Sequence, residues 1–347
     1  MPLTSTLSVR DTLARRDNEY TDALRRFEQR HELDWHAPTP AETSGGAVSV
    51  VIPARNVAYC LGQVLDALRA QDTRGPFEVI VVDDASTDAT FRVAVGHPLG
   101  PTVVRLPSRQ GSAAARNAGT ALAQADTVLF LDADMVLPPH ALADVAARAT
   151  ADLVLVGFRH NVPFTADGDG HAVVPVQAAS LAADLRVRWT PPVETVLPYS
   201  GITLTAPLDG RPLDATDDLR ALGEGRWYYD WDLPRMVVTA VMAAPRAALL
   251  DVGGLHAAFG RTGWGCEDTY LGAVLIAAGL RVAPLRQLVG YHLDPPDAPA
   301  AWAAKLATWP DTLALYRRLL AQPPPGGQSA EFLRATRELL ADCEVLS

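Results

Sequence analysis

The sequence has 347 residues, of which 48% are hydrophobic and 20% charged, and its formal net charge is −10. This balance is typical of a folded globular protein and excludes a mainly disordered chain. The acidic charge argues against a nucleic-acid partner, because such binding depends on clustered Lys and Arg. Lys305 is the single lysine among the 30 basic residues, a bias that we attribute to genome composition.

No segment of the sequence is predicted to insert into a membrane. The longest apolar run, residues 271–280, is about half of the ~20 residues that a transmembrane helix needs. The N-terminus lacks the apolar core of a signal peptide. Cys60, Cys266 and Cys343 lie far apart, which indicates reduced thiols rather than a disulfide framework or a zinc site. We therefore expect a soluble, cytoplasmic protein without a transmembrane segment.

Residues 1–46 are predicted to form an N-terminal helical arm and a linker. Leu13, Tyr20, Leu24 and Phe27 recur at helical spacing, which favours one amphipathic helix. This helix would pack on its own body or pair with another subunit, so a homodimer through the terminal helices stays open.

From residue 47 onward, strands alternate with helices through short connections. Strands are predicted at 48–52, 77–82, 102–106, 127–131 and 151–158, and helices near 61–68, at 112–124 and at 138–149. This alternation is typical of an open, mainly parallel α/β sheet. Ligands of such sheets bind beyond the carboxyl ends of the strands.

The regular pattern is lost over residues 160–234, which include an aromatic cluster at 227–231. That cluster would stack sugars or contact an acceptor, or else belong to the core or a lid. Regular structure resumes over 236–243, followed by a helix at 267–278 and by C-terminal helices. Between these helices, short strands are predicted at 282–285 and 288–292.

Acidic residues follow the predicted strands. Asp84 is placed to accept hydrogen bonds from a ribose or a base, whereas Ser86 and Asp88 suit helix capping. Asp132 and Asp134, two residues apart after a buried strand, are placed to bind one divalent cation, with Mg²⁺ or Mn²⁺ suited to such oxygen ligands.

Two further positions carry chemistry. Glu267 and Asp268 open an apolar helix beside Trp264, where a carboxylate would act as a general base or interact with the helix dipole. His292 follows a short predicted strand, where it would serve a structural role or bind a metal ion.

Six segments in this order resemble the family 2 glycosyltransferases. They are Val-Val-Ile-Pro-Ala-Arg-Asn (50–56), Val-Val-Asp-Asp-Ala-Ser-Thr-Asp (81–88), Gly-Ser-Ala-Ala-Ala-Arg-Asn-Ala-Gly (111–119), Leu-Asp-Ala-Asp (131–134), Val-Gly-Gly-Leu (252–255) and Gly-Trp-Gly-Cys-Glu-Asp (263–268). The resemblance covers about residues 48–292. It implies a GT-A-like open twisted sheet flanked by helices in a catalytic domain at 47–293, with an acceptor region at 160–234 and a helical extension at 294–347.

The resemblance implies a set of donor-binding residues. Pro53 would lie against the nucleotide base, and Asp84 would hold the base or ribose with Asp83 behind it. Arg116 and Asn117 would face the donor from the helix that follows Gly111. Together these residues would bind a nucleotide sugar, most simply a UDP-sugar.

The resemblance also implies a metal site and a catalytic base. Asp132 would contact the nucleotide sugar, Asp134 would bind Mn²⁺ or Mg²⁺ on the diphosphate, and His292 matches a metal ligand of some relatives. Asp268 would be the catalytic base, with Glu267 orienting the acceptor.

Trp264 would pack against the donor or acceptor sugar. Two positions depart from the family pattern: Arg55 replaces a common aromatic residue, and Cys266 replaces a frequent glycine.

The implied activity is inverting, metal-dependent transfer of a sugar, in the hexosyltransferase class, to a glycan, peptide or small-molecule acceptor. The absence of a QxxRW motif and of membrane helices argues against a processive polymerase. One alternative is a catalytically silent nucleotide- or carbohydrate-binding module. A sugar nucleotidyltransferase is a second alternative, although its glycine-rich loop is absent after the first strand. The sequence leaves open the sugar, the linkage atom, the metal and the oligomeric state.

Overall fold

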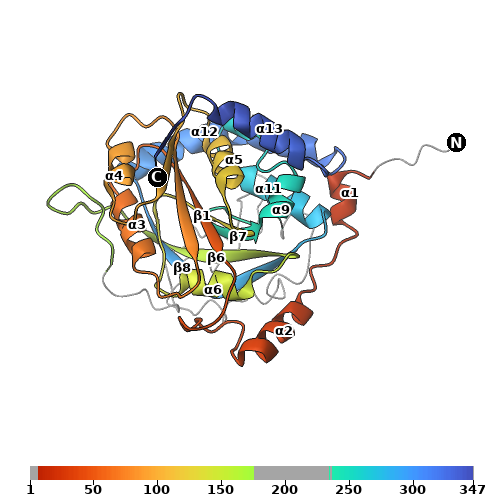
Figure 1. Cartoon of the computed structure of the whole chain (residues 1–347). Helices are drawn as coiled ribbons and strands as arrows, with labels where there is room; N and C mark the ends of the chain where they lie inside the picture. The colour runs from red at the N-terminus through yellow and green to blue at the C-terminus, as the bar shows by residue number, and fades with distance from the viewer. Residues whose placement is uncertain (1–6, 176–233, 235–236, 347) are drawn as a thin grey trace.

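The computed structural model describes residues 7–175, 234 and 237–346. These residues form a nine-stranded sheet with helices on both faces (Figure 1). The strand order is β5-β8-β6-β7-β4-β1-β2-β3-β9. The strands are β1 (Val48–Ala54), β2 (Phe77–Asp83), β3 (Thr102–Arg105), β4 (Thr127–Leu131), β5 (Met135–Val136), β6 (Leu153–Val162), β7 (Val241–Pro245), β8 (Arg281–Leu293) and β9 (Glu344–Leu346).

The β4-β1-β2-β3 part of the sheet is parallel, as the sequence predicts. β1 lies between β2 and β4, with Val50 paired to Val79 on one side and to Leu129 on the other. β3 extends the parallel part beyond β2. Because these strands are covered on both faces, their apolar Val, Ile and Leu runs are buried continuously.

The whole sheet is mixed, and the predicted α/β class is confirmed. β7 runs antiparallel between β4 and β6, while β5 and β9 pair antiparallel with β8 and β3. Strand direction leaves no mark on hydrophobic periodicity, so these antiparallel members were not predicted. The two short strands predicted at 282–285 and 288–292 are one strand, β8, whose pairing with β6 shifts register between Val156 and Phe158.

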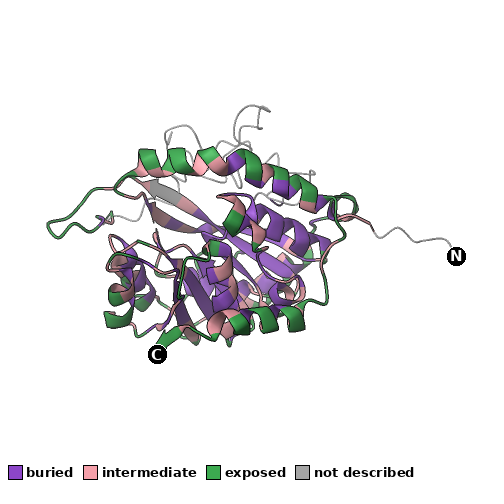
Figure 2. Cartoon of the chain, turned by 90° about the horizontal axis from the view of Figure 1, so that it is seen from above, coloured by how far each residue is buried: buried purple, intermediate pink, exposed green. Residues whose placement is uncertain are grey.

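Helices cover both faces of the sheet. They are α1 (Val9–Leu13), α2 (Thr21–His31), α3 (Leu61–Arg69), α4 (Thr90–Gly96), α5 (Ser112–Leu122), α6 (Ala141–Arg148), α9 (Arg246–Asp251), α10 (Ala258–Thr262), α11 (Glu267–Ala277), α12 (Ala298–Leu320) and α13 (Ser329–Leu340). Successive strand residues alternate between the two cores, so Val51 faces α5 and α11 whereas Val50 faces α3 and α6. Figure 2 shows buried residues in the sheet and inner helices and exposed residues on the outer helices.

The N-terminal residues form two helices, and the prediction of one helix is wrong. Val9 and Leu13 of α1 join the α11 core, whereas Phe27 of α2 joins the opposite core. Between the two helices, the Asn18 side chain donates to the Val282 carbonyl at 2.8 Å and accepts from its amide at 2.6 Å. These two hydrogen bonds attach the segment between α1 and α2 to β8. The two N-terminal helices therefore pack on opposite faces of the same sheet.

Arg148, fully buried at the end of α6, fixes the segment that follows α2. Its guanidinium donates to the carbonyls of Trp35 and Ala37, each at 2.8 Å, and lies 3.3 Å from Asp144. It also lies 4.2 Å over the ring of Phe27. A buried charge with these partners is stable only while the segment stays in place.

Two predicted features lie outside the described residues. The aromatic cluster at 227–231 and most of the expected acceptor region at 160–234 fall within 176–233. In the part of the chain that is described, every helix is too short or too polar to cross a membrane.

We predict that Arg148→Met destabilises the protein by about 3–5 kcal/mol, because the buried Asp144 would lose its arginine partner and keep only its contact with His140. Urea unfolding followed by circular dichroism measures this change. Arg334→Met on the exposed face of α13 is the matched control, since its ion pairs with Glu331 and Glu338 lie in solvent. A loss below about 1 kcal/mol for Arg148→Met would contradict this role.

Candidate active site

The end of β2 places Asp84 against the loop between β3 and α5. Its carboxylate accepts from the backbone amides of Gln110 at 2.5 Å and Gly111 at 2.9 Å. Arg55 donates to the carbonyls of Asp84 at 2.5 Å and Ala85 at 3.1 Å, so this departure from the family pattern places a planar guanidinium on the loop that follows β2. Asp84 is thus buried at the predicted position, with both carboxylate oxygens bonded to backbone.

Asp83, the last residue of β2, is fully buried, and its place behind Asp84 in the donor site stays a prediction. It accepts from the Ser86 amide at 3.2 Å, and Arg105 approaches its carboxylate at 3.5 Å. Arg105, which no sequence motif marked, also lies 4.7 Å over the ring of Phe91. Pro53 is half-buried at the carboxyl end of β1, so the strand ends that were expected to face the nucleotide lie together.

Arg116 of α5 is the positive centre of a group of carboxylates. Its buried guanidinium forms an ion pair with Asp132 at the end of β4. The same charge acts on Glu267 and Asp268, where it opposes the rise of both pKa values. α5, β4 and the start of α11 therefore bring one cation and three carboxylates together.

Asn117, the next residue of α5, does not join this group. Its side chain donates to the Leu255 carbonyl at 2.8 Å and accepts from the Leu255 amide at 2.9 Å. A Cβ at Gly254 would lie 2.4 Å from the Asn117 oxygen, so the turn needs glycine there. Asn117 holds the Val252–Leu255 turn in this structure, and its predicted contact with the donor stays a prediction.

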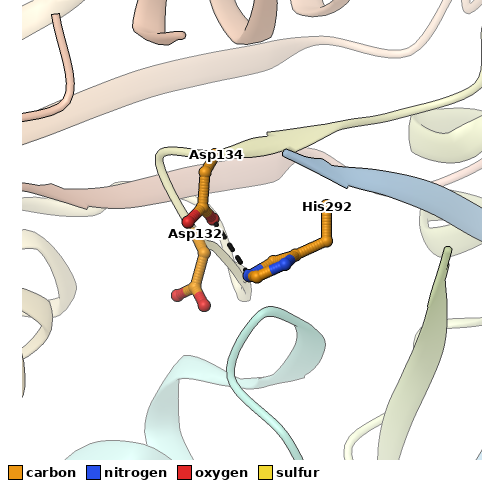
Figure 3. A group of neighbouring side chains, drawn as sticks. All are labelled: Asp132, Asp134 and His292. Carbon is orange, nitrogen blue, oxygen red and sulfur yellow. Dashed lines mark ion pairs between the residues drawn. The ribbon is translucent and has the colours of Figure 1, made fainter. Parts of the chain in front are cut away.

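Asp132, Asp134 and His292 lie together at the end of β4 and β8 (Figure 3), with one ligand atom from each within 4.8 Å of the others. His292 pairs with Met135 of β5, which sets it beside Asp134 across the strands. The Asp134 Oδ1 and His292 Nε2 atoms are 3.5 Å apart. The side chains of the three residues predicted to contact the metal and the nucleotide sugar thus lie close together.

This group fits a divalent cation. Burial, followed by the charge of Asp132, raises the pKa of Asp134 to about 7. Burial, followed by the charge of Arg159, lowers the pKa of His292 to about 3, which keeps the imidazole neutral and able to coordinate. Within the described residues, the buried Asp134 Oδ1 and His292 Nδ1 atoms make no hydrogen bond. Oxygen and imidazole ligands suit Mn²⁺ and are compatible with Mg²⁺.

Glu267 and Asp268 begin α11 on the other side of Arg116. Burial, followed by the charge of Asp268, raises the pKa of Glu267 to about 7. Burial also raises the pKa of Asp268, whose carboxylate accepts from the Thr239 amide at 3.3 Å. A carboxylate with a raised pKa is a better proton acceptor near neutral pH, which suits a general base.

Trp264 lies against α12. Its ring centroid is 5.5 Å from that of Trp302 and 5.8 Å from that of Trp309, and the Lys305 ammonium lies 5.4 Å from it. The tryptophan is half-buried, and its contact with a donor or acceptor sugar stays a prediction.

The glycines on either side of Trp264 allow α12 to approach this closely. A Cβ at Gly263 would lie 2.3 Å from Thr308, and one at Gly265 would lie 2.4 Å from Trp309. Both glycines have positive φ, and Cys266 after them has φ 65°. Cys266 therefore keeps the left-handed turn that glycine would adopt freely, with its side chain buried in the core.

Residues 49–174 match the family described as Glycosyl transferase family 2. An uncharacterized glycosyltransferase of Nostoc sp. is 33% identical over 144 residues, which are 40% of this chain and 44% of that protein. The validoxylamine A glucosyltransferase of Streptomyces hygroscopicus subsp. limoneus is 28% identical over 279 residues, 73% of this chain and 53% of its own length. The chain spans about half the length of these relatives.

A solved structure shows the same fold. It is that of the mannosyltransferase PcManGT from Pyrobaculum calidifontis in complex with GDP-Man and Mn²⁺. The likeness has a TM-score of 0.52 at 19% identity and covers 96% of this chain and 83% of that one. At this identity the comparison establishes the GT-A fold and no substrate.

We predict that Glu267→Gln stabilises the protein at pH 8 and leaves it little changed at pH 4.5. Folding raises the pKa of Glu267 from 4.5 to about 7, so the folded state binds more protons than the unfolded state between these values. Stability therefore falls as pH rises through this window, and the amide removes that cost, on the order of 1–3 kcal/mol.

Thermal unfolding without metal or nucleotide at both pH values measures this difference. Glu331→Gln is the control with the opposite sign, because Arg334 lowers the pKa of that exposed carboxyl. Equal melting temperatures for Glu267→Gln and the parent at pH 8 would show that burial does not raise the pKa of Glu267.

Proposed function

The chain belongs to glycosyl transferase family 2, and on that premise we propose that it transfers a sugar from a nucleotide-sugar donor to an acceptor. The observation that supports this proposal best is the grouping of charges at the carboxyl edge of the sheet. Arg116, the Asp132–Asp134–His292 group and the Glu267–Asp268 pair come from distant parts of the sequence and meet there.

The two alternatives lack this support. A catalytically silent binding module has no need for two buried carboxylates at the start of α11, where burial makes their charge costly. A sugar nucleotidyltransferase would use a glycine-rich phosphate loop after β1, where this chain has Pro53, Ala54 and Arg55.

We propose that Asp134 and His292 hold a divalent cation, with Mn²⁺ as the first choice and Mg²⁺ as the second. Asp132 keeps its ion pair with Arg116, which orients one of its oxygens and leaves the carboxylate beside the nucleotide sugar. A bound cation supplies positive charge that offsets the negative charge developing on the donor diphosphate.

We propose an inverting displacement with Asp268 as the base. The acceptor group loses its proton to the Asp268 carboxylate as it attacks the anomeric carbon. The bond from that carbon to the diphosphate breaks, and its electron pair leaves with the nucleotide. Glu267, beside the base and 3.5 Å from the Ser112 hydroxyl, orients the acceptor.

The donor and the acceptor need separate panels. UDP-sugars form the first donor set and GDP-mannose the second, since the structural neighbour from Pyrobaculum was solved with GDP-Man. The acceptor panel includes glycans, peptides and small molecules, with validoxylamine A among the small molecules because a relative carries that name. Mass spectrometry of the products identifies the transferred sugar and the linkage atom.

We predict that Asp268→Asn lowers kcat by about 10²–10⁴-fold, because the amide cannot accept the acceptor proton. Calorimetric binding of UDP with Mn²⁺ should stay within about 3-fold of the parent. Full transfer activity in this variant would remove Asp268 from the base role. Loss of UDP binding together with activity would show instead that Asp268 supports the donor site.

We predict that Asp134→Asn weakens Mn²⁺-dependent UDP binding by about 100-fold or more, because a coordinating carboxylate is lost. Isothermal titration with UDP, with and without Mn²⁺, measures this effect. Asp126→Asn is the matched control, since Asp126 is exposed and lies just before the other end of β4. Metal-dependent binding that is equal in Asp134→Asn and the parent would exclude Asp134 as a ligand.

A further inference from the structure

A cavity of about 690 Å³ opens at the carboxyl edge of the sheet. As far as the described residues extend, its lining includes no residue predicted to bind the donor or the metal, or to act as the base. Small-molecule sites in proteins have volumes of about 300–1,000 Å³. The cavity therefore has room for a ligand that the donor and metal motifs do not assign.

Three segments form the walls of this cavity. They are the loop at 56–59 after β1, the tip of a hairpin at 165–173 after β6, and the connection at 295–297 between β8 and α12. Asp88, which follows β2, also lines the cavity, and its carboxylate accepts from the Ala58 amide at 3.1 Å. All of these segments follow the carboxyl ends of strands, where ligands of such sheets bind.

Hydrogen bonds hold the hairpin against the start of α3 (Figure 1). The Tyr59 carbonyl accepts from the Ala172 amide at 2.7 Å, and the Gln63 side chain donates to the Ala172 carbonyl at 2.9 Å. The Tyr59 ring packs against the Phe164 ring, with their centroids 5.7 Å apart. The walls of the cavity are therefore fixed by contacts within the fold itself.

The same wall touches the backbone of the proposed metal site. The Tyr59 hydroxyl donates to the carbonyl of Leu293, the residue after His292, at 3.5 Å. The Cys60 thiol donates at 3.4 Å to the carbonyl of Ala133, which lies between the two aspartates of the metal group. The cavity and the metal site are thus neighbours along one edge of the sheet.

The chemistry of the lining suits a neutral ligand that is rich in hydroxyl groups. The described lining residues include no lysine or arginine, and their polar groups come from Asn56, Asp88, Asp169, His171 and Asp297. Among the described residues, the carboxylates of Asp169 and Asp297 have no hydrogen-bond or ion-pair partner, so they can accept from ligand hydroxyls. The tyrosine and proline rings of the lining offer apolar surface to the flat face of a sugar. A nucleotide diphosphate would be repelled by these carboxylates.

The start of α12 connects the cavity to the aromatic residues beside the proposed base. Ala301 lines the cavity, and the next residue, Trp302, has a side chain that is 37% exposed. The Trp302 ring centroid is 5.5 Å from that of Trp264, which lies in the turn that leads to Asp268. An exposed tryptophan at the rim of a cavity presents a surface on which a sugar ring stacks.

We propose that this cavity binds one sugar unit of a neutral oligosaccharide acceptor. The acceptor extends from the cavity along the start of α12, over Trp302, to the base Asp268, where another of its units receives the transferred sugar. This inference rests on the proposed function and deepens it, because it names the class of acceptor. The unit in the cavity adds binding energy far from the reacting atoms, so it selects oligosaccharides over single sugars.

Neutral trisaccharides provide the first test. We titrate the full chain, with UDP and Mn²⁺ present, with maltotriose, cellotriose, mannotriose and chitotriose, and with the monosaccharide of each, by isothermal calorimetry. We expect at least one trisaccharide to bind with a Kd of about 1 mM or lower and its monosaccharide to bind at least about 10-fold more weakly. A protein that binds UDP with Mn²⁺ but none of the four trisaccharides at about 10 mM overturns the inference.

Variants of the cavity provide the second test. Ala301→Trp fills the cavity, and we expect it to weaken trisaccharide binding by about 10-fold or more while UDP binding stays within about 2-fold. Ala303→Trp adds the same ring at an exposed position of α12 outside the lining and should match the parent. Asp169→Asn keeps the size of the side chain and removes its charge, which should weaken trisaccharide binding by about 3–10-fold.

The outcomes distinguish this inference from the proposed function. If the parent fails to bind UDP with Mn²⁺, the proposed function fails and the inference falls with it. If the parent binds UDP and a trisaccharide, and Ala301→Trp and Asp169→Asn both bind that trisaccharide as the parent does, only the inference is overturned. A folded Ala301→Trp protein that loses UDP binding would place the cavity in the donor site and also overturn it. Binding of a lysine-rich peptide in place of the trisaccharides, weakened by salt, would show a site for cations instead.

Discussion

A buried guanidinium, Arg116, allows this protein to hold three carboxylates at one edge of its sheet. Asp132, Glu267 and Asp268 would repel one another if all were charged in a buried place, and Arg116 offsets that repulsion. The arginine reaches them because α5 packs closely on β1. Gly119 makes this approach possible, since a Cβ there would lie 2.3 Å from Val51.

The compensation by Arg116 is incomplete, and this matters for the chemistry. Burial still raises the pKa values of Asp134, Glu267 and Asp268. A folded protein without ligands therefore stores unfavourable electrostatic energy on both sides of Arg116. A cation on the Asp134 side and a proton on the Asp268 side are the two species that relieve it. These are the two events that the proposed transfer requires.

Much of the site could be predicted from the sequence because parallel strands end at a common edge. The carboxylates of Asp84, Asp132 and Asp134 each follow a buried strand, so their proximity follows from the topology. The hydrogen bonds between site side chains and the backbone of distant loops could not be predicted. Asn117 bonds to Leu255 and Asp84 to Gln110 and Gly111, and no local pattern encodes such distant pairings.

The features that the sequence did not predict share a physical cause, because each depends on packing between segments that lie far apart in the chain. The break between α1 and α2 depends on Asn18 meeting Val282, more than 260 positions away in the chain. Arg105 was visible in the sequence, but its ion pair with Asp83 follows from where β3 packs.

The close contact between α12 and the Gly263–Gly265 turn bears on how such enzymes can be recombined. In this protein the turn before α11 has no room for side chains because Thr308 and Trp309 fill that space. A hybrid protein that takes α11 from one parent and α12 from another would keep this packing only if the side chains on both helices fit together as they do here. The two helices therefore have to be exchanged together. Exchange of one alone would be tolerated only between parents that share Gly263, Trp264 and Gly265.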